Sequence, residues 1–154
     1  MPQKAIAAIA DLQKRLLRGA DEQVESEIRE CLNEWLKAVG GGSPEPVAFL
    51  YHPDAVLLAT FDPKPLTTPE ERKSYFANFT RKKELKAVAD TCHIHVFSED
   101  AAGASGLYTF RYITEGGDEM AVNARFTFNF IRDRENDRWL IVSHHSSQAP
   151  EVAP

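Results

Sequence analysis

Apolar residues in the first quarter of the chain recur at helical spacing. Residues 4–18 carry such a stripe, and Gly19 is expected to close this first helix; the stripe is Ile6, Ile9, Leu12 and Leu16. Asp21 can cap a second, longer helix. Its apolar residues recur at steps of three and four, which predicts one buried face: Val24, Ile28, Cys31, Leu32, Trp35 and Val39. The sequence GGGSPEP at 40–46 ends this helix as a loop within one domain.

The middle of the chain predicts one strand and one further helix. Residues 55–61 (AVLLATF) are a short apolar run that is typical of a buried strand. Thr68 is expected to cap the next helix, with Pro69 at its first position and Glu71 completing a capping box. This helix is predicted to continue to about residue 82.

From about residue 85 the pattern changes to period two. Four strands are predicted, separated by short polar turns, with the sequences LKAVADTCHIHVFS, AAGASGLYTFRYI, EMAVNARFTFNFIRD and RWLIVSHHS. This rhythm indicates an antiparallel meander that follows the helices. The predicted fold class is therefore α+β, with N-terminal helices packed on one face of a curved antiparallel sheet.

Alternation along each strand assigns its side chains to two faces. His144 and Ser146 are predicted on one face of the last strand, with Leu140 and Val142. The opposite face is predicted to hold Trp139, Ile141, Ser143, His145 and Ser147. On the preceding strand, Phe126, Phe128 and Phe130 are expected to pack on apolar partners, opposite Arg125, Thr127 and Asn129. The adjacent histidines therefore point to opposite sides.

Composition narrows the functional classes. A net charge of −5 and a pI near 5.5 argue against binding to nucleic acid. We expect no membrane span, because no apolar run approaches about 18 residues, and no signal peptide. Cys31 and Cys92 are interpreted as two free thiols, with a single disulfide as the alternative. Without a signal peptide, the expected location is cytoplasmic.

The strands carry candidate residues for three kinds of chemistry: metal binding, proton transfer and nucleophilic catalysis. His93 and His95 would lie about 7 Å apart on one face, and His145 could join them at a metal, but no matching carboxylate is visible. We therefore expect neither a metal nor a cofactor. His145 and Tyr108 are the candidate proton-transfer residues, with no acid set inside a strand to complete a pair. The serines near the end lack a nucleophile elbow.

Three segments carry a resemblance to a known family. HIHVFSEDAAGA at 93–104, RWLIVSHHSSQAP at 138–150 and KSYFANF at 73–79 resemble, in the same order, segments of the association (hub) domain of calcium/calmodulin-dependent protein kinase II. That domain belongs to the nuclear transport factor 2-like superfamily, which includes the SnoaL-like proteins and has a cystatin-like cone. The resemblance covers residues 20–154 and leaves 1–19 as an N-terminal helical extension. No kinase motifs are present, so it indicates a stand-alone protein of the bacterial type.

The resemblance implies self-assembly, as a homodimer or larger ring through the open sheet, and a deep pocket at the mouth of the cone. The expected pocket residues, for a small carboxylate or other polar ligand, are Arg72, Tyr75, Tyr108, Arg111, Arg125, Thr127, His145 and Ser146. The sequence departs from the family here, because arginines of the hub pocket fall on Tyr108, near Thr127 and, in some members, on Ser146.

Three functional hypotheses remain open. The first is a non-catalytic, oligomerising domain that binds a small ligand. The second is a SnoaL-like or ketosteroid-isomerase-like enzyme that acts on a small polar or cyclic substrate by acid–base chemistry. The third is a module that binds another protein through the Arg125, Thr127 and Asn129 face.

Overall fold

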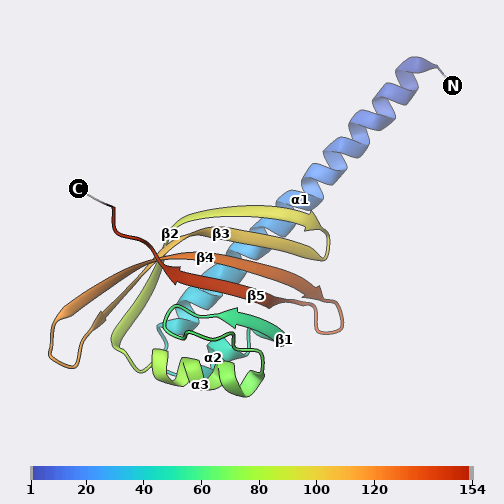
Figure 1. Cartoon of the computed structure of the whole chain (residues 1–154). Coiled ribbons are helices and arrows are strands. Elements are labelled where there is room, and N and C mark those ends of the chain that lie inside the picture. The colour runs from blue at the N-terminus through green and yellow to red at the C-terminus, as the bar shows by residue number, and fades with distance from the viewer. Residues whose placement is uncertain (1, 153–154) are drawn as a thin grey trace.

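A curved sheet wraps around the C-terminal half of one long helix (Figure 1). The structure is a computed structural model that describes residues 2–152. The long helix, α1, spans Gln3–Val39. The sequence predicted two helices here, and that break is wrong, because α1 passes through Gly19 without interruption. A glycine inside a helix costs about 1 kcal/mol relative to alanine, which the helix-forming residues on either side offset.

The second half of α1 supplies the helical side of the core. Its buried residues follow the predicted stripe: Val24, Ile28, Leu32, Trp35 and Val39. They pack mainly against β2 (Lys83–Ser98), the strand that lies beside the helix. Cys31 is half-buried beside this stripe and, like Cys92, is a free thiol. Burial raises the pKa of Cys31 to about 12, so this thiol stays protonated.

A short helix, α2 (Pro44–Ala48), leads into β1 (Tyr51–Leu58), which begins four residues earlier than the sequence predicted. The following helix, α3 (Pro69–Phe79), starts as expected. The Thr68 hydroxyl oxygen accepts a hydrogen bond from the backbone N–H of Glu71 at 3.2 Å. The Glu71 carboxylate in turn accepts from the hydroxyl of Thr68 at 3.1 Å and from the backbone of Thr67 at 3.3 Å.

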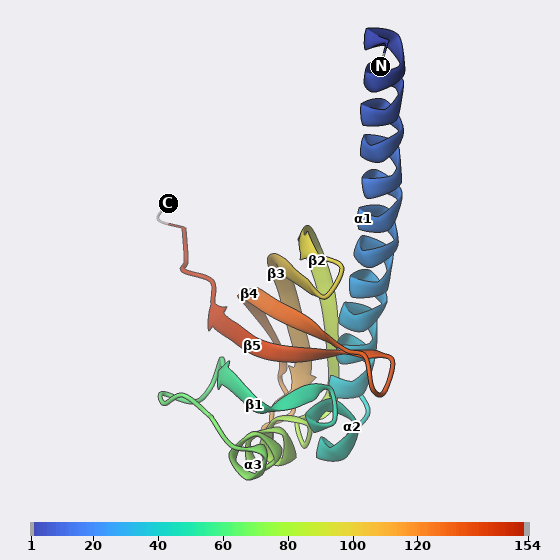
Figure 2. The same ribbon diagram turned by 90° about the vertical axis from the view of Figure 1, so that its right-hand side faces the viewer.

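The last four strands form the predicted meander. β2, β3 (Ala101–Ile113), β4 (Glu119–Asp133) and β5 (Arg138–Gln148) pair antiparallel in sequence order. β1 adds to the free edge of β5 in parallel, so the sheet order is β1-β5-β4-β3-β2 (Figure 2). The α+β class is confirmed. The sheet is mixed, because β1 pairs in parallel with β5 whereas all the other neighbouring strands pair antiparallel.

The inner face of the sheet is aromatic. Phe126, Phe128 and Phe130 are buried, as the alternation predicted. On β5 the register shifts between its pairs with Asn129 and Phe130, so Val142 is an extra, bulged residue. A bulge reverses the alternation on one side of it. Ile141 is therefore buried on the inner face together with His144 and Ser146, whereas the sequence placed it beside His145.

Close approach of two strands requires a glycine at position 106. A Cβ added there would lie 2.1 Å from the carbonyl oxygen of Thr91, where β2 bulges against β3. We expect Gly106→Ala to destabilise the protein by at least 2–3 kcal/mol, since backbone must move. The same change at Gly116, in the β3–β4 turn, meets its nearest atom at 3.8 Å and is the control. Urea denaturation measures both; equal stability of the two variants would contradict the assignment.

Candidate functional site

The polar side chains inside the cone form one chain of hydrogen bonds. It starts at α1, where Trp35 Nε1 donates to the hydroxyl oxygen of Tyr51 at 3.0 Å. The Tyr51 hydroxyl lies 2.7 Å from His144 Nδ1. On the other side of the imidazole, Nε2 lies 3.2 Å from the Tyr108 hydroxyl. Tyr108 donates to Ser146, which is also hydrogen-bonded to Thr60.

The partners set a single direction for this chain. Tyr51 receives its hydrogen bond from Trp35, so its own proton points to Nδ1 of His144. The imidazole therefore accepts at Nδ1 and carries its proton on Nε2, from which it donates to Tyr108. Tyr108 passes its proton toward Ser146, and Ser146 toward Thr60. Every donor finds an acceptor when the imidazole is neutral, and protonation of Nδ1 would leave two protons facing each other.

Burial favours the same neutral form. His144 is 3% exposed and stacks on Phe128, with ring centroids 3.8 Å apart. Burial without a counter-charge lowers the pKa of His144 to about 3, with a smaller contribution from neighbouring His145. Burial also raises the pKa of Tyr51 and of Tyr108 well above the ordinary value. At neutral pH the whole chain is uncharged.

The interior of the cone is filled rather than hollow. The cavity between Tyr75, Tyr108 and Ser146 has a volume of about 10 Å³, which is room for one water molecule at most. Aromatic rings occupy the remaining space, with Trp35 stacked on Tyr108 at a centroid distance of 5.6 Å. This inner cavity is much smaller than the deep pocket that the sequence led us to expect. A larger cleft of about 530 Å³ lies outside, between α3 and the 61–66 loop.

Arg72, an expected pocket residue, has a structural role. Its guanidinium donates to three backbone carbonyls, those of Ala55 at 2.6 Å, His52 at 2.9 Å and Pro53 at 3.0 Å. The side chain is 2% exposed. It joins α3 to the irregular start of β1, where the pairing with β5 is interrupted. The group that could have neutralised a carboxylate ligand is already engaged by the protein.

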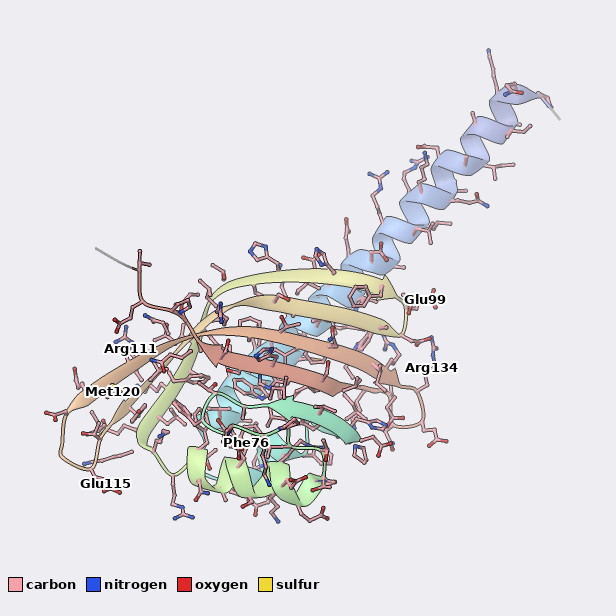
Figure 3. All side chains as sticks on the ribbon, viewed as in Figure 1. Phe76, Glu99, Arg111, Glu115, Met120 and Arg134 are labelled. Atoms are coloured by element: carbon pink, nitrogen blue, oxygen red, sulfur yellow. The ribbon has the colours of Figure 1, made fainter. Side chains whose placement is uncertain are left out.

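The other predicted pocket residues divide into two groups. Tyr75, Tyr108 and Ser146 come together around the small inner cavity. The remaining residues lie outside it, on the exposed side of the sheet: Arg111, Arg125, Thr127 and His145. Figure 3 shows Arg111 near Met120 at one end of the sheet, away from the interior residue Phe76. Of the two candidate proton-transfer residues, Tyr108 is inside and His145 is outside.

The interior residues missed by the site prediction are Trp35, Tyr51, Thr60 and His144. The alternation of β5 did separate His144 from His145 and paired it with Ser146. The prediction nevertheless chose His145 as the candidate, although His144 is the buried one. Burial was the better signal, because the inward face of β5 had to match the phenylalanine face of β4.

The candidate metal ligands are not brought together. His93, Ser105, Thr127 and His145 are successive partners across β2, β3, β4 and β5. Three strand spacings, or about 14 Å, therefore separate the two histidines. Within residues 2–152, no group of three histidine, cysteine, aspartate or glutamate side chains is placed to hold a metal ion.

The outer face of the sheet is the other candidate site, since no helix covers it (Figure 2). Its centre is built from small side chains: Gly103 pairs with Asn129, and Ser105 pairs with Thr127. Exposed apolar residues lie around this centre, including Phe97 at 64%, Val88 at 56% and Leu107 at 43%. We call this surface the outer sheet face.

Comparison with known proteins agrees with this architecture. The order of helices and the curved five-stranded sheet define a nuclear transport factor 2-like, cystatin-like cone. More specifically, residues 24–150 match the calcium/calmodulin dependent protein kinase II association domain, and the chain belongs to that family.

Solved structures give the same result. A candidate association domain from Xanthomonas campestris is 35% identical, with a TM-score of 0.76 over 82% of this chain and 88% of that one. The association domain of the C. elegans kinase is 16% identical, with a TM-score of 0.66 over 82% and 96%. A candidate dehydratase of the nuclear transport factor 2-like family from Streptomyces avermitilis is 16% identical, with a TM-score of 0.73 over 85% and 99%. None of the curated proteins matches the chain.

Residues 2–152 contain no helix with the length and apolarity of a membrane span.

The neutral imidazole predicts a pH-dependent stability. His144 has a pKa of about 3 when folded and an ordinary value of 6.5 when unfolded, so the unfolded chain binds the extra proton between these values. Its contribution to the free energy of unfolding is full above pH 6.5, falls as the pH drops toward 3, and totals roughly 5 kcal/mol. Urea titrations from pH 7 to pH 4 measure this slope. His144→Gln should be less stable at pH 7 but show a shallower dependence, and an unchanged slope would contradict the role of this residue.

Proposed function

We propose that this chain is a non-catalytic domain whose function is to join copies of itself through the outer sheet face. The observation that carries this proposal is the combination of small side chains at the centre of that face and exposed apolar side chains around it. Small residues permit close approach of a second sheet, and exposed apolar area is the part that association removes from water. Membership of an association-domain family supports the same function.

The polar character of the outer sheet face suits a paired surface. Ser105 and Thr127 hydroxyls lie 3.1 Å apart, and Asn129 donates to Ser143 at 2.8 Å. Hydroxyl and amide groups can exchange these bonds for bonds to a partner at little cost in free energy. The central pairs, Gly103 with Asn129 and Ser105 with Thr127, carry no charged side chain, which matches the depletion of charge in the core of protein interfaces. Arg125 adjoins this centre on β4 and donates to Ser147 at 3.3 Å.

The interior gives little support to the enzymatic alternative. Acid–base catalysis needs a group that gains and loses a proton near the working pH. Burial moves the pKa of His144 far below that range and the pKa of Tyr108 far above it. Both groups are also separated from solvent by packed rings. The hydrogen-bonded chain is better suited to holding the cone together than to turning over a substrate.

Binding of a small ligand is a second candidate function, and one feature of the cavities favours it. Tyr75 and Phe79 line both the inner cavity and the outer cleft between α3 and the 61–66 loop. Movement of the Tyr75 ring would join the two spaces. The ligand would be neutral rather than a carboxylate, because His144 is uncharged and the Arg72 guanidinium already donates to three carbonyls.

Truncation of Tyr75 tests this candidate. We expect Tyr75→Ala to be stabilised against heat by millimolar phenol, which can fill the vacated ring space and hydrogen-bond to Ser146. Benzoate, of similar shape but charged, should have little effect, since nothing offsets its desolvation. Differential scanning fluorimetry of the variant and the parent gives both comparisons. Equal stabilisation by benzoate, or none by phenol, would count against a neutral-ligand site.

Self-association through the sheet is tested by a single bulky charge. We expect Ser105→Arg, at the centre of the outer sheet face, to lower the mass of the particle by at least twofold at 10–50 µM, whereas the parent is a dimer or larger. The matched control is Ser74→Arg, the same change on the exposed surface of α3. Size-exclusion chromatography with light scattering measures all three. A Ser105→Arg particle with the parent's mass would refute the proposed interface.

A further inference from the structure

Residues 3–19 of α1 stand clear of the cone. The helix projects beyond the sheet in both views (Figures 1 and 2), and a Cβ at Gly19 would find no atom within 4 Å. Five large apolar side chains on this segment are exposed by about half or more: Ile6 48%, Ile9 48%, Leu12 52%, Leu16 66% and Leu17 65%. An isolated helix of this length is only marginally stable in water without packing. The segment therefore has the composition of a helix that packs on something.

Ile9, Leu12 and Leu16 fall on one seam, together with the small residues Ala5 and Gly19, whereas Ile6 and Leu17 lie off this seam. Ala5, Ile9, Leu12, Leu16 and Gly19 follow one another at alternating steps of four and three, which is the spacing of residues at the contact between two helices. At 3.6 residues per turn this seam is rotated by roughly a third of a turn from the stripe that packs on the sheet. The helix can therefore contact its own sheet and a second helix at the same time.

We propose that residues 4–31 of α1 pair with the same segment of a second copy, in antiparallel orientation. This contact is distinct from the outer sheet face and goes beyond the function proposed above. The occupant is assigned by charge. Residues 4–18 carry four basic side chains and one acidic one, whereas residues 21–30 carry five acidic side chains and one basic one. An antiparallel pair places the basic half of each helix on the acidic half of the other, and a parallel pair places like charges together.

One register places seam positions opposite seam positions and also brings opposite charges together. When Leu16 lies opposite Gly19 of the second copy, Leu12 lies opposite its Gln23, and Arg15 flanks the seam beside Glu22. By symmetry this charge pair forms twice. Shifting the register by one heptad would instead place Arg15 of one copy beside Arg15 of the other, so that like charges meet. Arg15 is bonded to Asp11 within its own helix at 3.0 Å, but both side chains are more than 60% exposed, and such a pair is weak enough to exchange.

Two surfaces on one chain predict a specific pattern of particle masses. The parent should grow beyond a dimer as its concentration rises. Ser105→Arg should leave a helix-paired dimer, and Leu16→Asp should leave a sheet-paired dimer. The double variant should be a monomer. Analytical ultracentrifugation distinguishes these cases. A monomeric Ser105→Arg would overturn the helix pairing and leave the sheet interface standing, whereas a monomeric Leu16→Asp would overturn the sheet interface and leave the helix pairing standing.

Charge exchange tests the register. In the Ser105→Arg background, Arg15→Glu should raise the dissociation constant of the dimer about tenfold by placing two like-charge pairs beside the seam. Arg15→Glu combined with Glu22→Arg should restore it to within about threefold of the parent background. Lys14→Glu makes the same change in net charge on the opposite side of the helix and should have little effect. Failure of the exchange to restore affinity would overturn this register.

A distance measurement tests the orientation. Spin labels at Lys4→Cys, with Cys31 and Cys92 replaced by alanine, should be about 40 Å apart in the antiparallel register, from a rise of 1.5 Å per residue. A parallel pair would hold them about 10 Å apart. Double electron–electron resonance separates the two values, and the short distance would overturn the proposal. The labelled residue, Lys4, is at the end of the paired segment and off the seam, so the label itself does not occupy the contact.

Discussion

The fold depends on a neutral imidazole held between two tyrosine hydroxyls. His144 lies where α1, β1, β3 and β5 meet, and each of these elements contributes a partner to its hydrogen-bonded chain. A buried polar group without a partner costs several kcal/mol, so these elements are stable only in the arrangement that satisfies the ring. The aromatic residues around it then pack in one way. His144 therefore selects the arrangement of these elements, and the burial of the apolar residues stabilises that arrangement.

This arrangement explains why the interior and the outer face have different characters. Inside, the polar groups from Trp35 to Thr60 form one hydrogen-bonded chain and the cavity beside them is about 10 Å³, so the cone has a packed core. Outside, the sheet shows small hydroxyl and amide side chains with apolar neighbours. Because the interior polar groups bind one another, the self-association that we propose uses the surface. Fold alone does not decide the function.

Much of the architecture follows from pattern. The meander and the buried stripe of α1 follow from the periodic spacing of apolar residues, and the cap at Thr68 follows from residue types at fixed offsets. The parallel pairing of β1 could not be predicted, because both its neighbours in sequence are helices and the pairing involves residues more than eighty positions away. The continuous helix was missed because Gly19 carries a weak local signal for a helix end.

The candidate site was harder to predict, since the critical choice was between adjacent residues. Alternation separated His144 from His145, but which of them faces inward depends on the bulge at Val142 and on contact with Phe128. Arg72 illustrates the same limit. A basic residue on a helix near the mouth of a cone resembles a residue that binds a ligand. The guanidinium of Arg72 instead donates to backbone carbonyls of β1, which leaves it unavailable to a ligand. Such competition is visible only when the distances are known.

The uninterrupted path of α1 through Gly19 has a mechanical consequence. A helix that ran only to Gly19 would be hinged there, and its tip would swing freely. The observed helix is instead a stiff lever whose base is clamped in the core by Trp35 and Ile28. Residue 4 lies about 30 Å from residue 24 along its axis. A tilt of about 10° at the clamp would thus carry the tip through about 5 Å, so a small repacking at the sheet becomes a large displacement at the far end.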